Sequence, residues 1–166
     1  MHWITRERPK IDRVACPWLI ARFVDREPVF HFVRAADVLD GARQLGAIPY
    51  DVEGVELSHV GPLCSFDAFL AKYRLEDPLL RDIAVIVRGA DTAHLDLVPQ
   101  CAGLLAISLG LSRLFADDHE QLRHGFVVYD ALYAWLKGAR NETHAWNPQR
   151  SPLPPVPDWA TPGVRF

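Results

Sequence analysis

Residues 96–136 read DLVPQCAGLLAISLGLSRLFADDHEQLRHGFVVYDALYAWL, and this stretch sets the class of fold. Apolar residues dominate Leu97 to Phe115, and after Asp117–Asp118 they return at three- and four-residue steps to about Leu136. Such spacing places apolar side chains along one face of a helix. We therefore predict two long helices, the first capped by Asp96 and the second by Asp117 or Asp118.

Four shorter helices are predicted upstream of this pair. Each starts at a residue that favours a helix N-terminus or stops at a glycine that favours a C-terminus. Residues 91–96 then form a polar break before the long pair. In chain order, the four start near Asp12 with Pro17 in the first turn, run over residues 35–45 to Gly46, start at the N-cap Ser65, and start at Asp77–Pro78.

Two short apolar runs between these helices, residues 29–33 and 48–52, are predicted as strands, and residues 1–11 as a further strand or arm. The predicted fold is therefore mainly α, in the α+β class, with five to six helices and a small sheet near the N-terminal half. We place the domain at residues 1–138. Residues 139–166, rich in Pro and Trp, are expected to pack on that domain or on a partner.

The composition is that of one globular domain. Hydrophobic residues make up 49% and charged residues 23% of the 166 positions, which suffices for a buried core. A net charge of −3 without any Lys/Arg run does not fit a nucleic-acid-binding surface. The longest apolar stretch, around residues 101–111, is too short to cross a bilayer. We therefore expect neither nucleic acid nor a membrane as partner, and a homodimer stays open.

The cysteines indicate a reducing compartment. Cys16, Cys64 and Cys101 have neither the even count nor the short spacing of a disulfide framework or a zinc ribbon. The first ten residues also lack the apolar core of a signal peptide. We therefore expect three free thiols and a cytoplasmic protein.

Two polar clusters contain the residue types of a metal site. Glu56 and His59 lie three residues apart, and Asp118 and His119 stand at a predicted helix start. Carboxylate–imidazole pairs from two distant segments form metal sites in helical bundles. The alternatives are a loop position for the first pair and a plain helix cap for the second.

Basic residues beside acidic ones form two further clusters. Arg88 and Asp91 end an apolar helix, where Arg88 and Gly89 also suit an ordinary helix C-terminus. Arg13 follows Asp12 and offers two parallel hydrogen bonds to an oxyanion. The alternative for Asp12 is a local helix cap paired with Arg13.

The order of these motifs resembles the chromate-resistance protein family of the ChrB C-terminal type, over about residues 4 to 137. The motifs are long, and four of them, residues 10–20, 55–59, 86–91 and 117–119, hold polar residues of the clusters above. The motifs are residues 10–20 (KIDRVACPWLI), 46–51 (GAIPYD), 55–59 (VELSH), 64–69 (CSFDAF), 86–91 (IVRGAD), 109–115 (LGLSRLF), 117–119 (DDH) and 129–133 (YDALY).

This resemblance implies a role in chromate resistance. Members of the family occur with chromate efflux transporters. In regulator-type members, this domain follows an N-terminal DNA-binding region and is thought to help sense chromate. Here the motifs begin almost at Met1, so we expect a stand-alone domain without that region.

The leading hypothesis is a metalloprotein, a metal-dependent redox or hydrolytic enzyme that acts on a small oxygen-bearing anion such as chromate. Mixed imidazole and carboxylate ligands with an open position suit iron, manganese or zinc. Arg13 and Arg88 would neutralise the anion, and Cys64 would be a redox partner or a ligand. The predicted metal ligands are Glu56, His59 and His119, with Asp118 or Asp91 as a further ligand.

Two other functions stay open. The first is a non-catalytic module that binds or senses chromate or another oxyanion through arginines. The second is an interaction domain whose polar residues are helix caps and buried networks. The arginines of the first alternative are Arg13, Arg22, Arg88 and Arg113.

Overall fold

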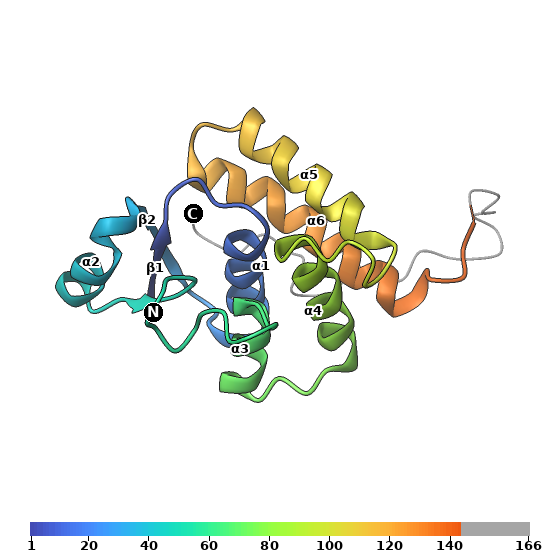
Figure 1. Ribbon diagram of the computed structural model, residues 1–166, viewed down its shortest axis with the longest axis horizontal. Helices are drawn as coiled ribbons and strands as arrows, with labels where there is room; N and C mark the ends of the chain where they lie inside the picture. Colours follow the sequence, from blue (N-terminus) through green and yellow to red (C-terminus); the bar gives the residue numbers. More distant parts are fainter. Residues whose placement is uncertain (144–166) are drawn as a thin grey trace.

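The computed structural model describes residues 1–143, and most of the predicted Pro/Trp-rich tail lies outside the described residues (Figure 1). A three-stranded sheet and six α-helices form this part, which confirms the mainly helical α+β prediction. The elements are β1 (His2–Arg6), α1 (Ile11–Leu19), the π-helical η1 (Ile20–Val24), β2 (Val29–Val33), the 3-10 turn η2 (Ala35–Asp37), α2 (Val38–Leu45), β3 (Ile48–Pro49), α3 (Ser65–Tyr73), α4 (Pro78–Asp91), α5 (Gln100–Leu114) and α6 (Asp118–Gly138).

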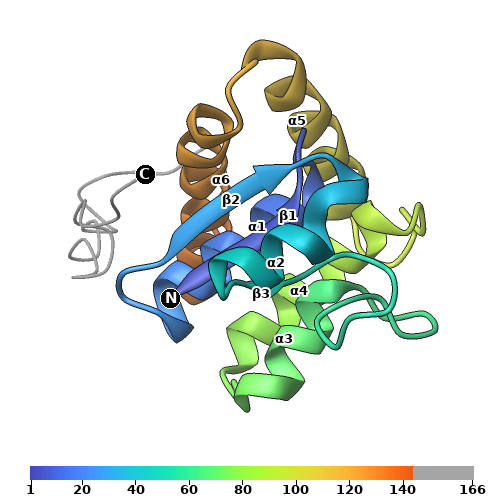
Figure 2. The same cartoon turned by 90° about the vertical axis from the view of Figure 1, so that its left-hand side faces the viewer.

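The sheet has the order β2-β1-β3, and both pairs are parallel. Alternate side chains of β1 point to opposite faces, as a strand requires. Trp3 packs in the main core, whereas Ile4 packs against Val38 and Ala42 of α2, which covers the opposite face (Figure 2). Because β1 and β3 are parallel neighbours, the segments that follow their carboxyl ends meet at one edge of the sheet.

Helix α1 is the central helix of the fold and lies among the others (Figure 1). Every residue of α1 except Arg13 is buried, and the helix contacts α3, α4, α5 and α6. Asp12, in the first turn of α1, is therefore a buried carboxylate at the margin of the apolar core. Such a group requires hydrogen-bond or ionic partners, because an uncompensated buried charge is very costly.

Three predicted helix ends are confirmed. Asp77 caps α4 and accepts a hydrogen bond from the Leu79 N–H, and Asp117 caps α6 in the same way. Gly46 ends α2 in the left-handed conformation. The three cysteines are free and buried. None of the helices in residues 1–143 combines the length and apolar character that a membrane crossing requires.

The predicted place of one proline and the predicted start of one helix are wrong. Pro17 lies inside α1 rather than in its first turn, and the wider π-helical turn η1 follows it. Helix α5 starts at Gln100 instead of Leu97, directly after Pro99. A proline disfavours the helical conformation in the residue before it, so the preceding segment stays outside the helix. Asp96 therefore does not cap α5.

Two further local predictions are wrong, and one alternative does not hold. Strand β3 stops at Pro49 instead of residue 52, because Asp51 takes a left-handed backbone with φ 51°. Ser65 is the first residue of α3 rather than its cap. Gly89 does not end α4, which continues to Asp91. A Cβ at Gly89 would lie 2.3 Å from Cys101 Sγ, so this glycine permits the close packing of α4 on α5.

Candidate metal centre

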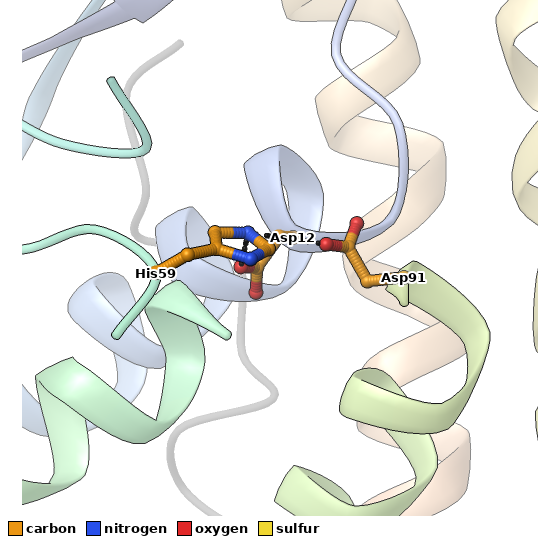
Figure 3. A group of neighbouring side chains, drawn as sticks. All are labelled: Asp12, His59 and Asp91. Carbon is orange, nitrogen blue, oxygen red and sulfur yellow. Dashed lines mark ion pairs between the residues drawn. The ribbon is translucent and has the colours of Figure 1, made fainter. Parts of the chain in front are cut away.

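Three side chains from distant parts of the sequence converge beside the carboxyl edge of the sheet (Figure 3). Asp12 comes from the first turn of α1, His59 from the loop between β3 and α3, and Asp91 from the last residue of α4. One donor atom of each lies within 4.8 Å of the other two, and no other group of three His, Cys, Asp or Glu residues in residues 1–143 does so. We call these three residues the Asp12–His59–Asp91 cluster.

Carboxylates surround a single imidazole nitrogen. His59 Nε2 lies 3.2 Å from Asp91 Oδ2 and 3.4 Å from Asp12 Oδ2. It also lies 3.4 Å from Oδ1 of Asp51, which follows β3. Two ligands about 2.1 Å from one divalent ion are roughly 3.0–3.4 Å apart in octahedral or tetrahedral coordination. The distances from His59 to Asp12 and Asp91 therefore match those between ligands of one ion.

Asp12 is held in place by the N-terminus of α3. Its Oδ2 accepts the Ser65 N–H at 2.6 Å, and its Oδ1 accepts the Phe66 N–H at 3.2 Å. The Cys16 thiol lies 3.6 Å from the same Oδ1. The first N–H groups of a helix have no partner within the helix and favour negative charge. A carboxylate from α1 therefore caps α3, which fixes Asp12 at the cluster.

Asp51 connects the cluster to two arginines. Its Oδ1 accepts the Ser65 hydroxyl at 2.9 Å. Its Oδ2 pairs with Arg6 at 2.8 Å and with Arg13 Nε at 3.2 Å. Ser65 therefore orients both Asp12 and Asp51, through its N–H and its hydroxyl. Supporting hydrogen bonds of this kind orient the ligands of metal sites.

The charges within the cluster shift two pKa values. Burial, together with the nearby charges of Asp12 and Asp51, raises the pKa of Asp91 to about 6. Hydrogen bonding to Asp12 and the charges of the three carboxylates raise the pKa of His59 to about 9, against the effect of desolvation. Without a metal, a protonated His59 therefore balances the carboxylates. A divalent cation and this proton would compete for the same position.

The cluster opens to solvent through a hollow of about 410 Å³. The His59 side chain is 40% exposed, whereas that of Asp12 is 2% exposed. Arg6, Arg13 and Lys10 also line the hollow. The cluster is therefore a carboxylate-rich donor set at the base of an accessible hollow that has cations on its wall. Carboxylate and imidazole donors together suit manganese, iron or zinc.

Of the predicted metal ligands, the structure brings only His59 and Asp91 together. Glu56 lies on the surface, where Lys72 donates to both of its carboxylate oxygens at 2.7 and 2.8 Å. The ring of His119 packs edge-on against Phe32. Asp118 accepts the backbone N–H of Arg8 at 3.1 Å. The predicted set of Glu56, His59 and His119 is therefore not formed, because α6 presents His119 to β2 and not to the loop of His59.

The predicted catalytic residues contact two different carboxylates, Asp51 and Asp67. Arg13 is part of the surroundings of the cluster through Asp51. Arg88 pairs with Asp67 at 3.3 Å. Cys64 also lies against Asp67, with Sγ 3.5 Å from Oδ2. Burial first, and then the charges of nearby carboxylates, raise the pKa of the Cys64 thiol well above its usual range, so the reactive thiolate is disfavoured.

The four arginines of the alternative anion site do not share one partner. Arg13 and Arg88 pair with Asp51 and Asp67, and Arg22 makes a two-point contact with Asp130 at 3.1 and 2.9 Å. Arg113 lies at the exposed end of α5. A joint oxyanion site of these four arginines is therefore not formed.

Two acidic residues of the site, Asp12 and Asp51, were not predicted from the sequence as members of a metal site. Asp12 has the signal of a helix cap, and it does cap a helix, but the helix is α3 and not α1. Asp51 lies at the end of a predicted strand and gave no signal by itself. Its position after a strand that pairs in parallel with β1 places it beside Asp12, and that pairing is a tertiary property.

All three residues of the cluster lie in the part of the chain that matches a known protein family. Residues 3–136 match the family model described as the C-terminal domain of ChrB. The chain is 30% identical over 141 residues to Protein ChrB of Cupriavidus metallidurans, across 83% of this chain and 41% of that protein. It therefore spans about two fifths of the length of this relative. No solved structure matches the chain significantly.

Proposed function

The chain belongs to the ChrB C-terminal domain family, which is associated with chromate resistance, and on that premise we propose that it is a metalloprotein. In this proposal the Asp12–His59–Asp91 cluster binds one divalent transition metal, manganese, iron or zinc. When bound, the metal would supply the redox or Lewis-acid chemistry for a reaction of a small oxygen-bearing anion. The protein contributes the ligands, the cations around them and the opening to solvent.

One observation carries this proposal. The imidazole nitrogen of His59 lies 3.2–3.4 Å from oxygens of Asp12 and Asp91, and one donor atom of each of the three residues lies within 4.8 Å of the other two, as ligands of one ion would. A structural role alone explains part of the arrangement, since Asp12 caps α3 and Asp51 pairs with arginines. Asp91 lies at the carboxyl end of a helix, where negative charge is disfavoured, and a bound cation would offset this cost together with the charges of the nearby carboxylates.

The residues around the cluster suit an anionic ligand of the metal. A bound divalent ion supplies Lewis acidity toward an oxygen of the anion. Arg13, itself half-buried, holds Asp51 through Nε and the carbonyls of Arg6 and Glu7 through Nη1. It therefore keeps positive charge beside the cluster without occupying the hollow. The burial of Asp12 limits its access to water and strengthens its interaction with a cation.

The experiment is a calorimetric titration of EDTA-treated protein with Mn²⁺ and Zn²⁺, and with Fe²⁺ under anaerobic conditions. We expect close to one metal per chain for at least one of these ions. The variant His59→Ala should weaken binding at least about a hundredfold, beyond the usual loss from a supporting residue. His124→Ala is the matched control, because this exposed histidine stacks on Phe115 outside the cluster. Equal affinity of His59→Ala and wild type would refute the metal site.

A further inference from the structure

A second hollow, of about 660 Å³, has three basic residues among its five lining residues. Its lining contains no carboxylate, in contrast to the hollow of the cluster. Positive side chains around a concave surface attract and hold anions. The lining residues are Arg8, Lys10, Leu109, Ser112 and Arg113. We call this space the basic hollow.

Two of these cations have no carboxylate partner among residues 1–143. Lys10 and Arg113 are exposed and make no salt bridge there. The arginines near the metal centre differ, because Arg6 and Arg13 both pair with Asp51. Lys10 and Arg113 are therefore available to an external anion. The carboxyl end of α5 alone accounts for a cation at Arg113, but not for Lys10, which precedes α1.

Arg8 is held rigidly at the wall of the basic hollow. Its guanidinium donates to the carbonyls of Ser112, Phe115 and Ala116, which end α5. Its backbone takes the left-handed conformation, with φ 55°, and its N–H donates to the carboxylate of Asp118. The segment from Arg8 to Lys10 is thus fixed against both α5 and α6, which orders the wall before any ligand binds.

The basic hollow adjoins the hollow of the cluster. Lys10 and Leu109 line both spaces. A ligand held by Lys10 and Arg113 therefore lies next to the opening of the Asp12–His59–Asp91 cluster. The apolar side chain of Leu109, 42% exposed, stands at the boundary between the two spaces.

We propose that the basic hollow binds the oxyanionic end group of an organic ligand, a phosphate, phosphonate, sulfonate or carboxylate, whose opposite end reaches the cluster. The first half of this proposal stands on the basic hollow alone, and the second half rests on the proposed metal function. A hollow of about 660 Å³ lies in the range that organic ligands occupy and is much larger than a tetrahedral oxyanion. Leu109 supplies apolar contact for the body of such a ligand.

The test uses two probes with the same charged group. Methylphosphonate and phenylphosphonate are titrated into EDTA-treated protein by calorimetry. We expect both to bind, and phenylphosphonate to bind several-fold more tightly because its ring contacts Leu109. The double variant Lys10→Gln/Arg113→Gln should weaken both at least about tenfold. The matched control is Arg81→Gln/Lys137→Gln, which removes the same charges from exposed helix positions outside the basic hollow.

The possible results of these titrations test the anion site, the organic ligand and the metal function separately. Absence of phosphonate binding, or an equal loss in the control variant, overturns the anion site. Equal affinity for the two phosphonates overturns the organic body and leaves an inorganic anion as the ligand. Because these titrations contain no metal, their failure is independent of the Mn²⁺ titration. If the protein binds phosphonates but no metal, the metal function is refuted, and so is the proposal that the ligand extends to the cluster. The anion site itself is then retained.

Discussion

The backbone N–H of Ser65 donates to Oδ2 of Asp12 at 2.6 Å, across 53 positions of sequence. The same oxygen lies 3.4 Å from His59 Nε2. One carboxylate thus caps α3 and faces the candidate metal position. Its structural and functional roles are separable by substitution, because a cap requires only an acceptor oxygen whereas a cation favours negative charge.

Asp12→Ala and Asp12→Asn should therefore differ in stability but agree in metal binding. Removal of the side chain leaves the Ser65 and Phe66 N–H groups without this acceptor, so we expect Asp12→Ala to lower the free energy of unfolding by about 2 kcal/mol. Asp12→Asn keeps an acceptor oxygen and should lose about half as much. Both should bind Mn²⁺ at least about tenfold more weakly.

Urea unfolding measures these differences. Asp40→Ala is the control, because this exposed aspartate pairs only with Arg43 on the surface and should change stability by less than about 0.5 kcal/mol. An Asp12→Ala protein as stable as Asp40→Ala would show that α3 does not depend on this cap.

A second prediction concerns which residues belong to the metal centre. Asp91→Asn should weaken Mn²⁺ binding at least about tenfold, because it replaces an anionic ligand by a neutral one. Glu56→Gln and His119→Ala should leave the affinity unchanged, because these side chains contact Lys72 and Phe32 instead. Calorimetry on the three variants distinguishes the two ligand sets. Loss of metal in His119→Ala with retention in Asp91→Asn would favour the ligand set inferred from sequence.

The helices of this fold are predictable because their ends carry local signals. Asp77 with Pro78, Asp117, and Gly46 each act on the backbone within a few residues, and each does so in the structure. The presence of a small sheet is also predictable, because short apolar runs stand between turns. The local signal of Asp12 points to a cap of its own helix, α1, and only tertiary packing makes it the cap of α3 instead.

The site is less predictable than the fold because it depends on parallel strand pairing. Asp51 reaches His59 only because β3 pairs with β1, and nothing in the spacing of residues 46–59 specifies that partner. Glu56 illustrates the converse. Its spacing from His59 suits a helix, but the segment is a loop, and the two side chains have different partners. The error therefore lies in applying a helical period to a segment without helical structure.

The metal-free protein should show a pH dependence that arises at His59. The pKa of His59 in the folded protein is raised from 6.5 to about 9, mainly by its interaction with Asp12. The protonated ring therefore stabilises the fold fully below about pH 6.5, and this contribution is lost as the pH rises through 9. Because the side chain is 40% exposed, solvent screening should keep the effect below about 1 kcal/mol.

Two measurements check this dependence. The ring protons of His59 should titrate by NMR with a midpoint near 9 in EDTA-treated protein. The difference in unfolding free energy between wild type and His59→Ala should also shrink between about pH 6.5 and 9. A midpoint near the ordinary value of 6.5 would contradict the close approach of the carboxylates to this ring.

Native thiols should react slowly. All three cysteines are buried, and burial raises the pKa values of Cys16 and Cys64. We expect a thiol-specific disulfide reagent at pH 8 to modify the native protein at least about a hundredfold more slowly than the urea-unfolded protein, because the thiolate is the reactive form. Fast modification of one thiol, traced to Cys64 by mass spectrometry and abolished in Cys64→Ser, would restore a redox role for that residue.

The packing of α4 on α5 allows a test with two glycines. A Cβ at Gly89 would lie 2.3 Å from Cys101 Sγ and 2.9 Å from the His94 carbonyl oxygen, whereas a Cβ at Gly103 meets no atom within 4 Å. Gly89→Ala should therefore destabilise the protein by about 1–3 kcal/mol through overpacking. Gly103→Ala should stabilise it by roughly 0.5–1 kcal/mol, because alanine favours a helix interior. Since Gly89 lies two residues before Asp91, its variant should also weaken Mn²⁺ binding, and the Gly103 variant should not. Urea unfolding and calorimetry on both proteins measure these effects, and equal stability of the two variants would refute the tight contact between α4 and α5.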